Sequence, residues 1–119
     1  MLLIMIAGPY RSGTGNDPIL IKRNMEKLEA MALPIFNKGH IPMIGEWVAN
    51  PLIDLAGSKT IGDEIFLELQ YPVAHRLLSK CDAILRIPGE SVGADKDVEV
   101  ARSLGLKVFF SINDIPNAE

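Results

Sequence analysis

Four short apolar segments alternate with helix-like segments along this chain, and that alternation constrains the fold more than any other feature. The apolar segments are residues 2–7, 40–44, 82–88 and 107–112. The first is a continuous apolar run, which is typical of a strand buried on both faces of a parallel sheet. The alternation predicts an α/β fold: a doubly wound parallel sheet of four to five strands with helices on both faces.

The segment between the first two predicted strands, residues 17–39, is expected to be one helix. Asp17 is placed to cap its N-terminus, and Pro18 suits its first turn. Pro34 is expected to kink or shorten this helix because proline lacks the amide hydrogen. Gly39 is expected to end it.

The region between the second and third predicted strands has two parts. Residues 45–61 contain Pro51 and are predicted to form a long irregular loop, a kind of segment that is usually functional or mobile. Residues 62–81 are predicted to be helical, with Pro72 breaking that helix or starting a second one. The last helix is predicted over residues 94–105.

The order of the strands follows from the connections. Right-handed crossovers leave few topologies, and the simplest is the flavodoxin-like order 2-1-3-4. This order makes the first and third strands neighbours, and their outgoing helices lie on opposite faces of the sheet. A crevice then opens between the two loops that follow these strands, residues 8–17 and 88–94. We therefore expect both loops to line one binding pocket.

Composition bounds the class of protein. The 119 residues, 48% of them hydrophobic, are expected to form one domain, residues 1–119. The net charge of −3 and the lack of a basic run argue against nucleic acid as a partner. The single cysteine, Cys81, excludes an internal disulfide and suits a reducing compartment. The apolar N-terminus stops at Gly8, too short for a signal peptide or a membrane span, so we expect a cytoplasmic protein without a membrane partner.

The first loop has the composition of an anion-binding turn. Its glycines, Gly8 among them, would let backbone amides approach a ligand, and the helix N-terminus behind it would favour a negative group. Arg11 could add a charge-assisted contact. The loop lacks both the Walker sequence and the third glycine of the dinucleotide fingerprint. Since His40 and His75 also stand alone, without metal-ligand spacing, we expect no cofactor and no metal. A turn that merely uses glycine remains the alternative.

The second loop is followed by three acids. Ser91 and Gly93 could hold a phosphate or sugar oxygen. Asp95 and Asp97 suit the positive end of the helix dipole, which stabilises each by about 0.3–1 kcal/mol. Glu99 lies further in, and its spacing from Asp95 costs a few tenths of a kcal/mol. Glu99 is therefore a candidate catalytic carboxylate at the mouth of the crevice, with an ordinary solvated helix surface as the alternative.

Three separated blocks resemble one family. They are "IAGPYRSG" at the first strand, "GHIPMI" at the second, and "CDAILRIPGESVGADKDVEVARSLGLKV" near the end. Together they resemble the nucleoside 2-deoxyribosyltransferase superfamily, and most closely its small DUF4406-type branch. That branch has an "AGPY" start, a "GH-P" second strand and a "PGW-x-S-x-GA-x-x-E-x-x-x-A" element. The family fold is a Rossmann-like doubly wound sheet, in agreement with the fold predicted from the alternation.

The resemblance implies a chemistry. In this family a helix glutamate attacks the anomeric carbon of a deoxynucleoside and forms a covalent glycosyl intermediate, and the matching residue is Glu99. In the branch that hydrolyses deoxynucleoside 5′-monophosphates, the phosphate is held by residues that match Arg11, Ser12 and Ser91. Trp47 could stack on a base or simply pack. The candidate substrate-binding residues are Gly8, Tyr10, Arg11, Ser12, Trp47, Ser91, Gly93 and Asp97.

The implied protein is a hydrolase or transferase of the N-glycosidic bond in deoxynucleosides or their 5′-monophosphates, acting as a homodimer or larger homo-oligomer. The chain departs from the family pattern in several places. Ala74 stands where a second carboxylate is usual, and Glu90 replaces a tryptophan. Glu99 lies one or two residues further from Ser91 than the glutamate does in characterised members. His75 could substitute as an acid or be structural. A non-catalytic nucleotide-binding module of the same fold therefore remains the alternative.

Overall fold

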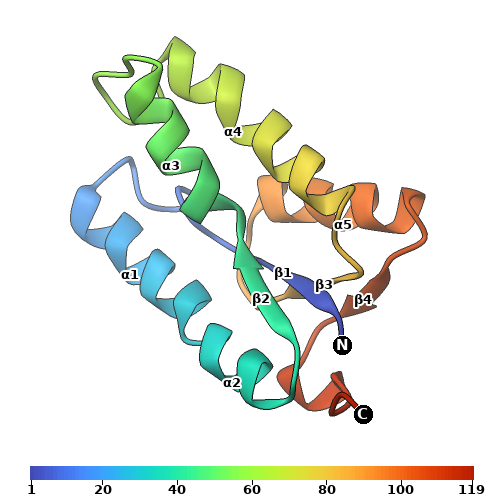
Figure 1. The fold of residues 1–119 in the computed structure, drawn as a ribbon. Helices are drawn as coiled ribbons and strands as arrows, with labels where there is room; N and C mark the ends of the chain where they lie inside the picture. Colours follow the sequence, from blue (N-terminus) through green and yellow to red (C-terminus); the bar gives the residue numbers. More distant parts are fainter.

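Four parallel strands form a single sheet in the computed structural model, which describes all 119 residues (Figure 1). The strands are β1 (Leu3–Ala7), β2 (Ile41–Ile44), β3 (Ala83–Arg86) and β4 (Lys107–Phe109). Their order across the sheet is β2-β1-β3-β4, and every pairing is parallel. The predicted α/β class and the predicted strand order are both confirmed.

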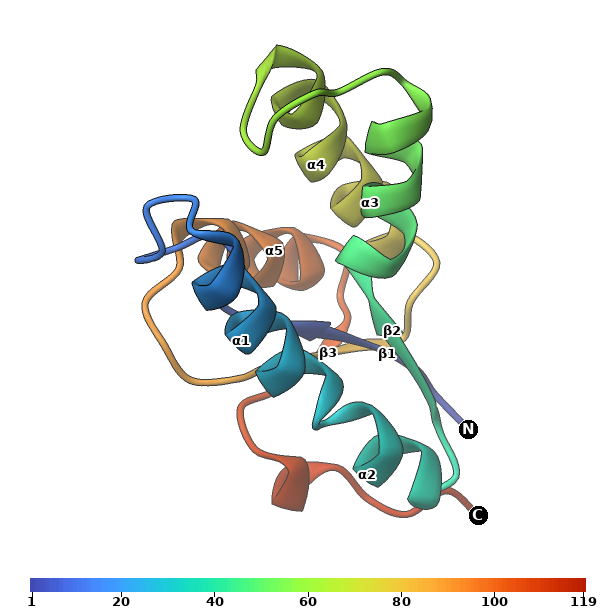
Figure 2. The same ribbon diagram turned by 90° about the vertical axis from the view of Figure 1, so that its left-hand side faces the viewer.

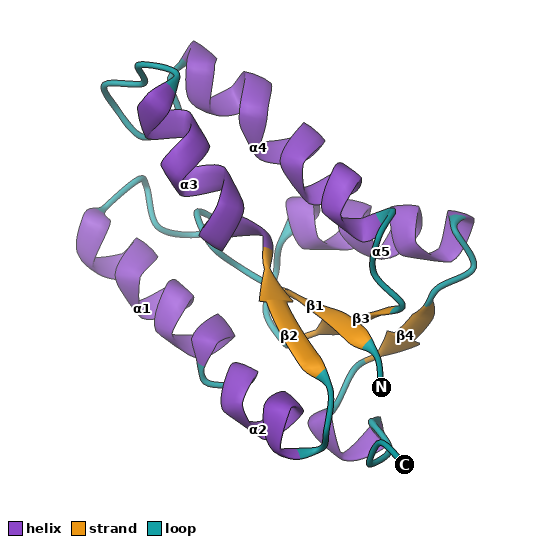
Figure 3. Cartoon of the chain, in the orientation of Figure 1, coloured by secondary structure: helices purple, strands orange, loops and turns teal.

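Five α-helices and one 3₁₀ turn surround the sheet. They are α1 (Pro18–Glu29), α2 (Ala32–Asn37), α3 (Gly45–Leu55), α4 (Glu64–Leu78), α5 (Val92–Ser103) and the 3₁₀ turn η1 (Ile112–Asp114). Helices lie on both faces of the strands (Figure 3). None of the helices combines the length and the apolar character needed to cross a membrane.

Each face of the sheet has its own core, because successive side chains along a strand point to opposite faces. Ile4 and Ile6 of β1 belong to the core under α1, α2 and the C-terminal segment. Met5 and Ala7 belong to the core under α5 and the end of α4. The fully apolar β1 predicted from the sequence is explained by this burial on both sides.

The hairpin formed by α3 and α4 stands away from the sheet and extends the molecule along its longest axis of 44 Å (Figure 2). A third, smaller core of Ala49, Ile53 and Phe66 holds the two helices together. Tyr10, from the loop after β1, also packs against this core. The hairpin therefore contacts the rest of the protein where the strands end, which is where a crevice is expected.

The prediction of an irregular loop over residues 45–61 is wrong, because most of this segment is the helix α3. Pro51 lies inside that helix, and Pro72 likewise lies inside a continuous α4 rather than ending it. A proline within a helix removes a backbone hydrogen bond. Packing of Ile53 against Phe66 between the two helices offsets that loss, so tertiary contacts override the local signal.

The prediction for α1 is correct at its start and wrong at its end. Asp17 caps the helix, its side chain accepting a hydrogen bond from the amide of Ile19 at 2.9 Å, with Pro18 at the first position. The segment is not one helix kinked at Pro34, because the break falls at residues 30–31. Pro34 lies in the first turn of α2, where its amide would have no helical partner in any case.

His40 joins both ends of the chain to the sheet. Its buried ring accepts a hydrogen bond from the amide of Leu2 at Nδ1, 3.0 Å away. Its Nε2 lies 2.6 Å from the carbonyl oxygen of Pro116 and donates to it. The C-terminal segment is also held by a backbone hydrogen bond of 2.7 Å from the amide of Ala118 to the carbonyl oxygen of Lys38. A neutral imidazole with hydrogen on Nε2 satisfies both of its contacts.

We expect His40→Ala to lower the free energy of unfolding by about 1–3 kcal/mol, because two backbone groups lose their partner. Urea denaturation followed by circular dichroism measures this loss. Lys22→Ala, on the exposed surface of α1, is the control and should change stability by less than about 0.5 kcal/mol. Equal effects of the two substitutions would show that the histidine contacts are not stabilising.

Candidate active site

A cavity of about 300 Å³ opens where β1 and β3 end, between the sheet and the α3–α4 hairpin. This volume is at the small end of the range for pockets that bind small molecules. The two loops after β1 and β3 contribute Gly8, Tyr10, Arg11, Ser12 and Ser91, and the first turn of α5 contributes Val92, Gly93 and Ala94. The helices contribute Gly45, Glu46, Ala49, Asn50, Ile53, Phe66, Gln70, Tyr71, Ala74 and Asp97. The prediction that both loops line one pocket is confirmed.

Two glycines let these loops lie against each other. A β-carbon on Gly8 would come within 2.3 Å of the Ile87 side chain. One on Gly89 would come within 2.6 Å of the Pro9 ring, and the φ of Gly89 is +121°. Such contacts are too short for any other residue, so these glycines are required by packing. Gly8 lines the cavity as predicted, and its contact with Ile87 gives it a structural role as well.

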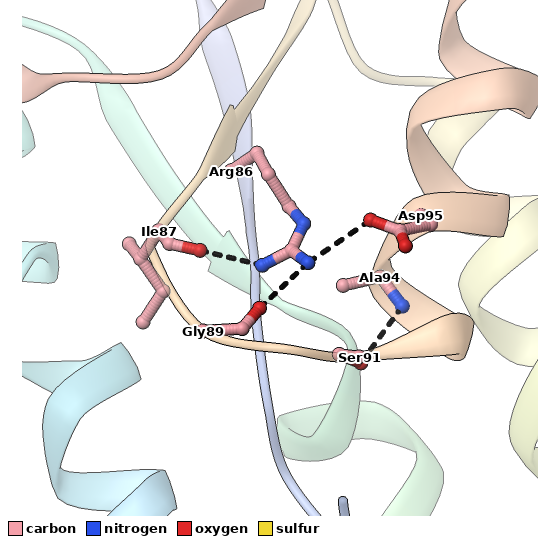
Figure 4. A network of polar contacts seen from close by, with 6 residues as sticks. All are labelled: Arg86, Ile87, Gly89, Ser91, Ala94 and Asp95. Atoms are coloured by element: carbon pink, nitrogen blue, oxygen red, sulfur yellow. Dashed lines mark hydrogen bonds and ion pairs between the residues drawn. The ribbon is translucent and has the colours of Figure 1, made fainter.

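Arg86 holds the loop after β3 in place (Figure 4). Its side chain is buried at the end of the strand and donates to the carbonyl oxygens of Ile87 and Gly89. It also donates to Asp95 at 3.0 Å. One guanidinium therefore ties the strand, the turn and the start of α5 together. Ser91 then caps α5, its hydroxyl accepting from the amide of Ala94 at 3.1 Å.

The direction in which α5 leaves this loop points Asp97, not Glu99, toward the cavity. Ala94, Val98 and Ala101 form the buried stripe of α5, and Asp97 borders that stripe on the cavity side. Residues two apart on a helix point in nearly opposite directions, since each residue turns by about 100°. Glu99 is exposed and does not line the cavity. The expectation that Glu99 reaches the crevice is therefore wrong.

The sequence contained a signal for Asp97 in the spacing of the element that resembles the family. The family element reads S-x-GA-x-x-E, which places the carboxylate six residues after the serine. Counted from Ser91, that position is Asp97, and Glu99 lies two residues beyond it.

Asp97 is held in an unusual electrostatic environment. Its side chain is only 15% exposed. Burial, and then the charge of Glu46, raise the pKa of Asp97 from 3.8 to about 7, against a smaller opposing effect of Arg86. Burial likewise raises the pKa of Glu46, which lies in the first turn of α3 and lines the same cavity. Two carboxyl groups from different helices thus share one partly dehydrated site.

Glu46 was not predicted from the sequence. It is the second residue after β2, in the segment predicted to be an irregular loop, so no helix wall was expected there. One signal was available: a carboxylate immediately after a strand of a parallel sheet lies at the edge where ligands bind.

Arg11 and Tyr10 form the rim of the cavity. Arg11 donates to Gln70 and to Asn16, each at 3.2 Å, and its guanidinium lies 4.9 Å from the centre of the Phe66 ring. All of these partners are neutral, so the positive charge of Arg11 is not compensated by a carboxylate. The hydroxyl of Tyr10 accepts from Asn50 at 3.1 Å, and burial raises the pKa of Tyr10. The rim is therefore suited to an anionic group.

Trp47 is the other predicted residue that lies elsewhere. Its ring nitrogen donates to Glu29 at 3.1 Å, which ties α3 to α1, and it does not line the cavity. The expectation that Trp47 belongs to the binding pocket is wrong, because Trp47 follows Glu46 by one residue and points to a different side of α3.

No protein-family model matches the chain, and no curated protein matches it in sequence.

The raised pKa of Asp97 has a measurable effect on stability. Between about pH 4 and pH 7 the folded protein retains a proton on Asp97 that the unfolded chain has released. Stability is therefore lost as the pH rises through this window, and the loss is complete above it. We expect Asp97→Asn to raise the free energy of unfolding at pH 8 by about 1–4 kcal/mol, since one pKa unit corresponds to about 1.4 kcal/mol.

Urea denaturation between pH 4 and pH 8 measures this difference, which should vanish near pH 4. Glu99→Gln is the matched control on the same helix, and it should show no pH-dependent gain because Glu99 is exposed. A flat difference between Asp97→Asn and the native protein across this range would contradict the burial of an ionisable Asp97.

Proposed function

We propose that this protein cleaves the N-glycosidic bond of a deoxynucleoside or its 5′-monophosphate, passing the sugar to water or to a second base. The single observation that carries the proposal is the pair of carboxyl groups, Asp97 and Glu46, in one small cavity. Glycoside cleavage uses two carboxyl groups, one as nucleophile and one as acid and base. The carboxylate nucleophile implied by the family resemblance is assigned here to Asp97 instead of Glu99.

The reaction would proceed in two displacements. An oxygen of ionised Asp97 attacks the anomeric carbon, and the bond from that carbon to the base nitrogen breaks. The electron pair of this bond goes to the nitrogen, which takes a proton from Glu46. Water or a second base then attacks the same carbon, loses its proton to Glu46, and releases Asp97. Burial raises the pKa of Glu46, which favours the protonated form that a general acid needs.

The rim supports an anionic substrate. Arg11 has only neutral partners, and Ser12 lies beside it at the cavity. Ser91 lines the cavity from the opposite loop, though its hydroxyl already accepts the capping hydrogen bond from the amide of Ala94. A 5′-phosphate would therefore be held chiefly by Arg11, Ser12 and backbone amides of the loops.

Membership of the nucleoside 2-deoxyribosyltransferase superfamily is part of this proposal. Asp97 stands at the position of the family's nucleophilic glutamate when the spacing is counted from Ser91. Ala74, at the position of the usual second carboxylate, lines the cavity with a methyl group. Glu46 would supply the carboxyl group that Ala74 lacks.

A non-catalytic nucleotide-binding module is the second candidate. The observation that favours it is the raised pKa of Asp97, which leaves much of this nucleophile protonated at neutral pH. Such a module would bind nucleotides in the same cavity without releasing the base.

Base release from a panel of deoxynucleosides and their 5′-monophosphates, followed by liquid chromatography, tests the proposal. We expect Asp97→Asn to lower turnover by at least about 1,000-fold, because the amide cannot form the glycosyl ester. Glu99→Gln, two residues away and outside the cavity, should stay within about twofold of the native protein. Binding without base release in the native protein would support the module instead, and undiminished turnover in Asp97→Asn would contradict the assigned nucleophile.

The role of Arg11 has its own test. We expect Arg11→Ala to weaken binding of a deoxynucleoside 5′-monophosphate by roughly 10- to 100-fold, the size of a lost charge-assisted contact. Binding of the matching nucleoside should change much less. Calorimetry measures both affinities, and Arg23→Ala on the exposed surface of α1 is the charge-matched control. Equal losses of affinity for the two ligands would contradict the assignment of Arg11 to the phosphate.

A further inference from the structure

Two buried polar atoms, one on a residue that lines the cavity and one on a residue behind it, have no hydrogen-bond partner. They are Nε2 of His75, on α4, and Oδ1 of Asp97, on α5, and they lie 3.6 Å apart. Buried polar atoms are nearly always hydrogen-bonded, so two orphans facing each other call for an explanation. They are complementary, because an imidazole nitrogen and a carboxyl oxygen can share one proton.

The other charged groups near this pair do not replace that contact. Glu46, on α3, opposes the ionisation of Asp97, and Arg86, on β3, favours it without bonding to it. Tyr71 stacks at an angle beside the His75 ring, with a centroid distance of 6.2 Å. The ammonium nitrogen of Lys96 lies over the Tyr71 ring, 5.4 Å from its centre.

The rest of the His75 side chain reaches solvent. It is 37% exposed, although its Nε2 is buried against Asp97. Histidine changes its protonation state within the physiological pH range. His75 can therefore exchange protons with water while its Nε2 faces the carboxyl group.

We propose, on the basis of the proposed function, that His75 is a positioning residue for the nucleophile: its Nε2 takes the proton from Oδ1 of Asp97. The products of this transfer are an imidazolium and a carboxylate, joined by a charge-assisted hydrogen bond. Oδ2 of Asp97 then carries the attack on the anomeric carbon. In the glycosyl ester that results, Oδ1 is a carbonyl oxygen and still accepts the bond from His75.

This arrangement explains how a buried aspartate can act near neutral pH. Without a partner, Asp97 keeps its proton because its ionised form is poorly solvated and faces Glu46. His75 provides an acceptor for that proton next to Asp97. The pair titrates as a unit, and it becomes competent once it has released the first of its two protons.

The test follows the carboxyl carbon of Asp97 by NMR in the unliganded protein as the pH is varied. We expect its apparent pKa to rise by one unit or more in His75→Leu and by less in His75→Gln, whose amide can still donate a hydrogen bond. Arg76→Gln, exposed on the same helix, is the control and should leave the titration unchanged. An unchanged titration in folded His75→Leu or His75→Gln would overturn the proposal.

Kinetics provide the second readout. The acidic limb of the profile of kcat/KM against pH should move to higher pH in His75→Leu by the same amount as the NMR titration. A merely structural histidine would lower activity at all pH values without moving that limb, and this result would also overturn the proposal. If the native protein releases no base, the proposed function fails while the NMR titration still decides whether His75 and Asp97 share a proton.

Discussion

The buried guanidinium of Arg86 joins the end of β3 to the turn that follows it and to the first turn of α5. It donates to the carbonyl oxygens of Ile87 and Gly89 and to Asp95 (Figure 4). Hydrogen bonds from a charged donor contribute about 1.5–3 kcal/mol each, and burial of the side chain keeps water from competing. These bonds therefore tie the loop to the strand and to the start of α5. The direction in which α5 leaves the sheet decides which of its acids enters the cavity.

The α3–α4 hairpin, which stands away from the sheet, forms the second wall of the site. Its small core of Ala49, Ile53 and Phe66 lets the hairpin stand above the ends of the strands (Figure 2). Glu46 and Asp97 are thereby brought to one cavity from helices that follow different strands. Placing two acids together in a partly dehydrated cavity costs stability, and such costs are typical of functional sites.

The topology could be predicted from the sequence because each strand is announced by an apolar run and each loop by glycine. The same logic placed Gly8, Arg11, Ser12, Ser91 and Gly93 around one crevice. It failed where tertiary packing decides, since α3 forms in spite of Pro51. Glu46 was missed because the helix that carries it was not predicted.

The choice between Asp97 and Glu99 failed for a different reason. The two residues differ by about 200° around α5, so only one of them can face the cavity, and the rotation of the helix decides which one. The cap at Ser91 and the clamp of Arg86 set the rotation of the helix. Neither contact can be read from periodicity alone, because each depends on a loop conformation. Trp47 shows the same limit, since its contact with Glu29 depends on how α3 lies against α1.

The central claim is that Asp97 forms the bond to the sugar, and covalent trapping tests it most directly. A 2-deoxy-2-fluoroarabinosyl nucleoside slows release of a glycosyl ester, because fluorine destabilises the cationic transition state. Trypsin would release residues 97–102 as one peptide carrying both acids, after Lys96 and Arg102. The account predicts a peptide heavier by one fluorosugar, whose fragment ions beginning at Glu99 keep their native mass. Added mass on the fragments beginning at Glu99 would contradict it.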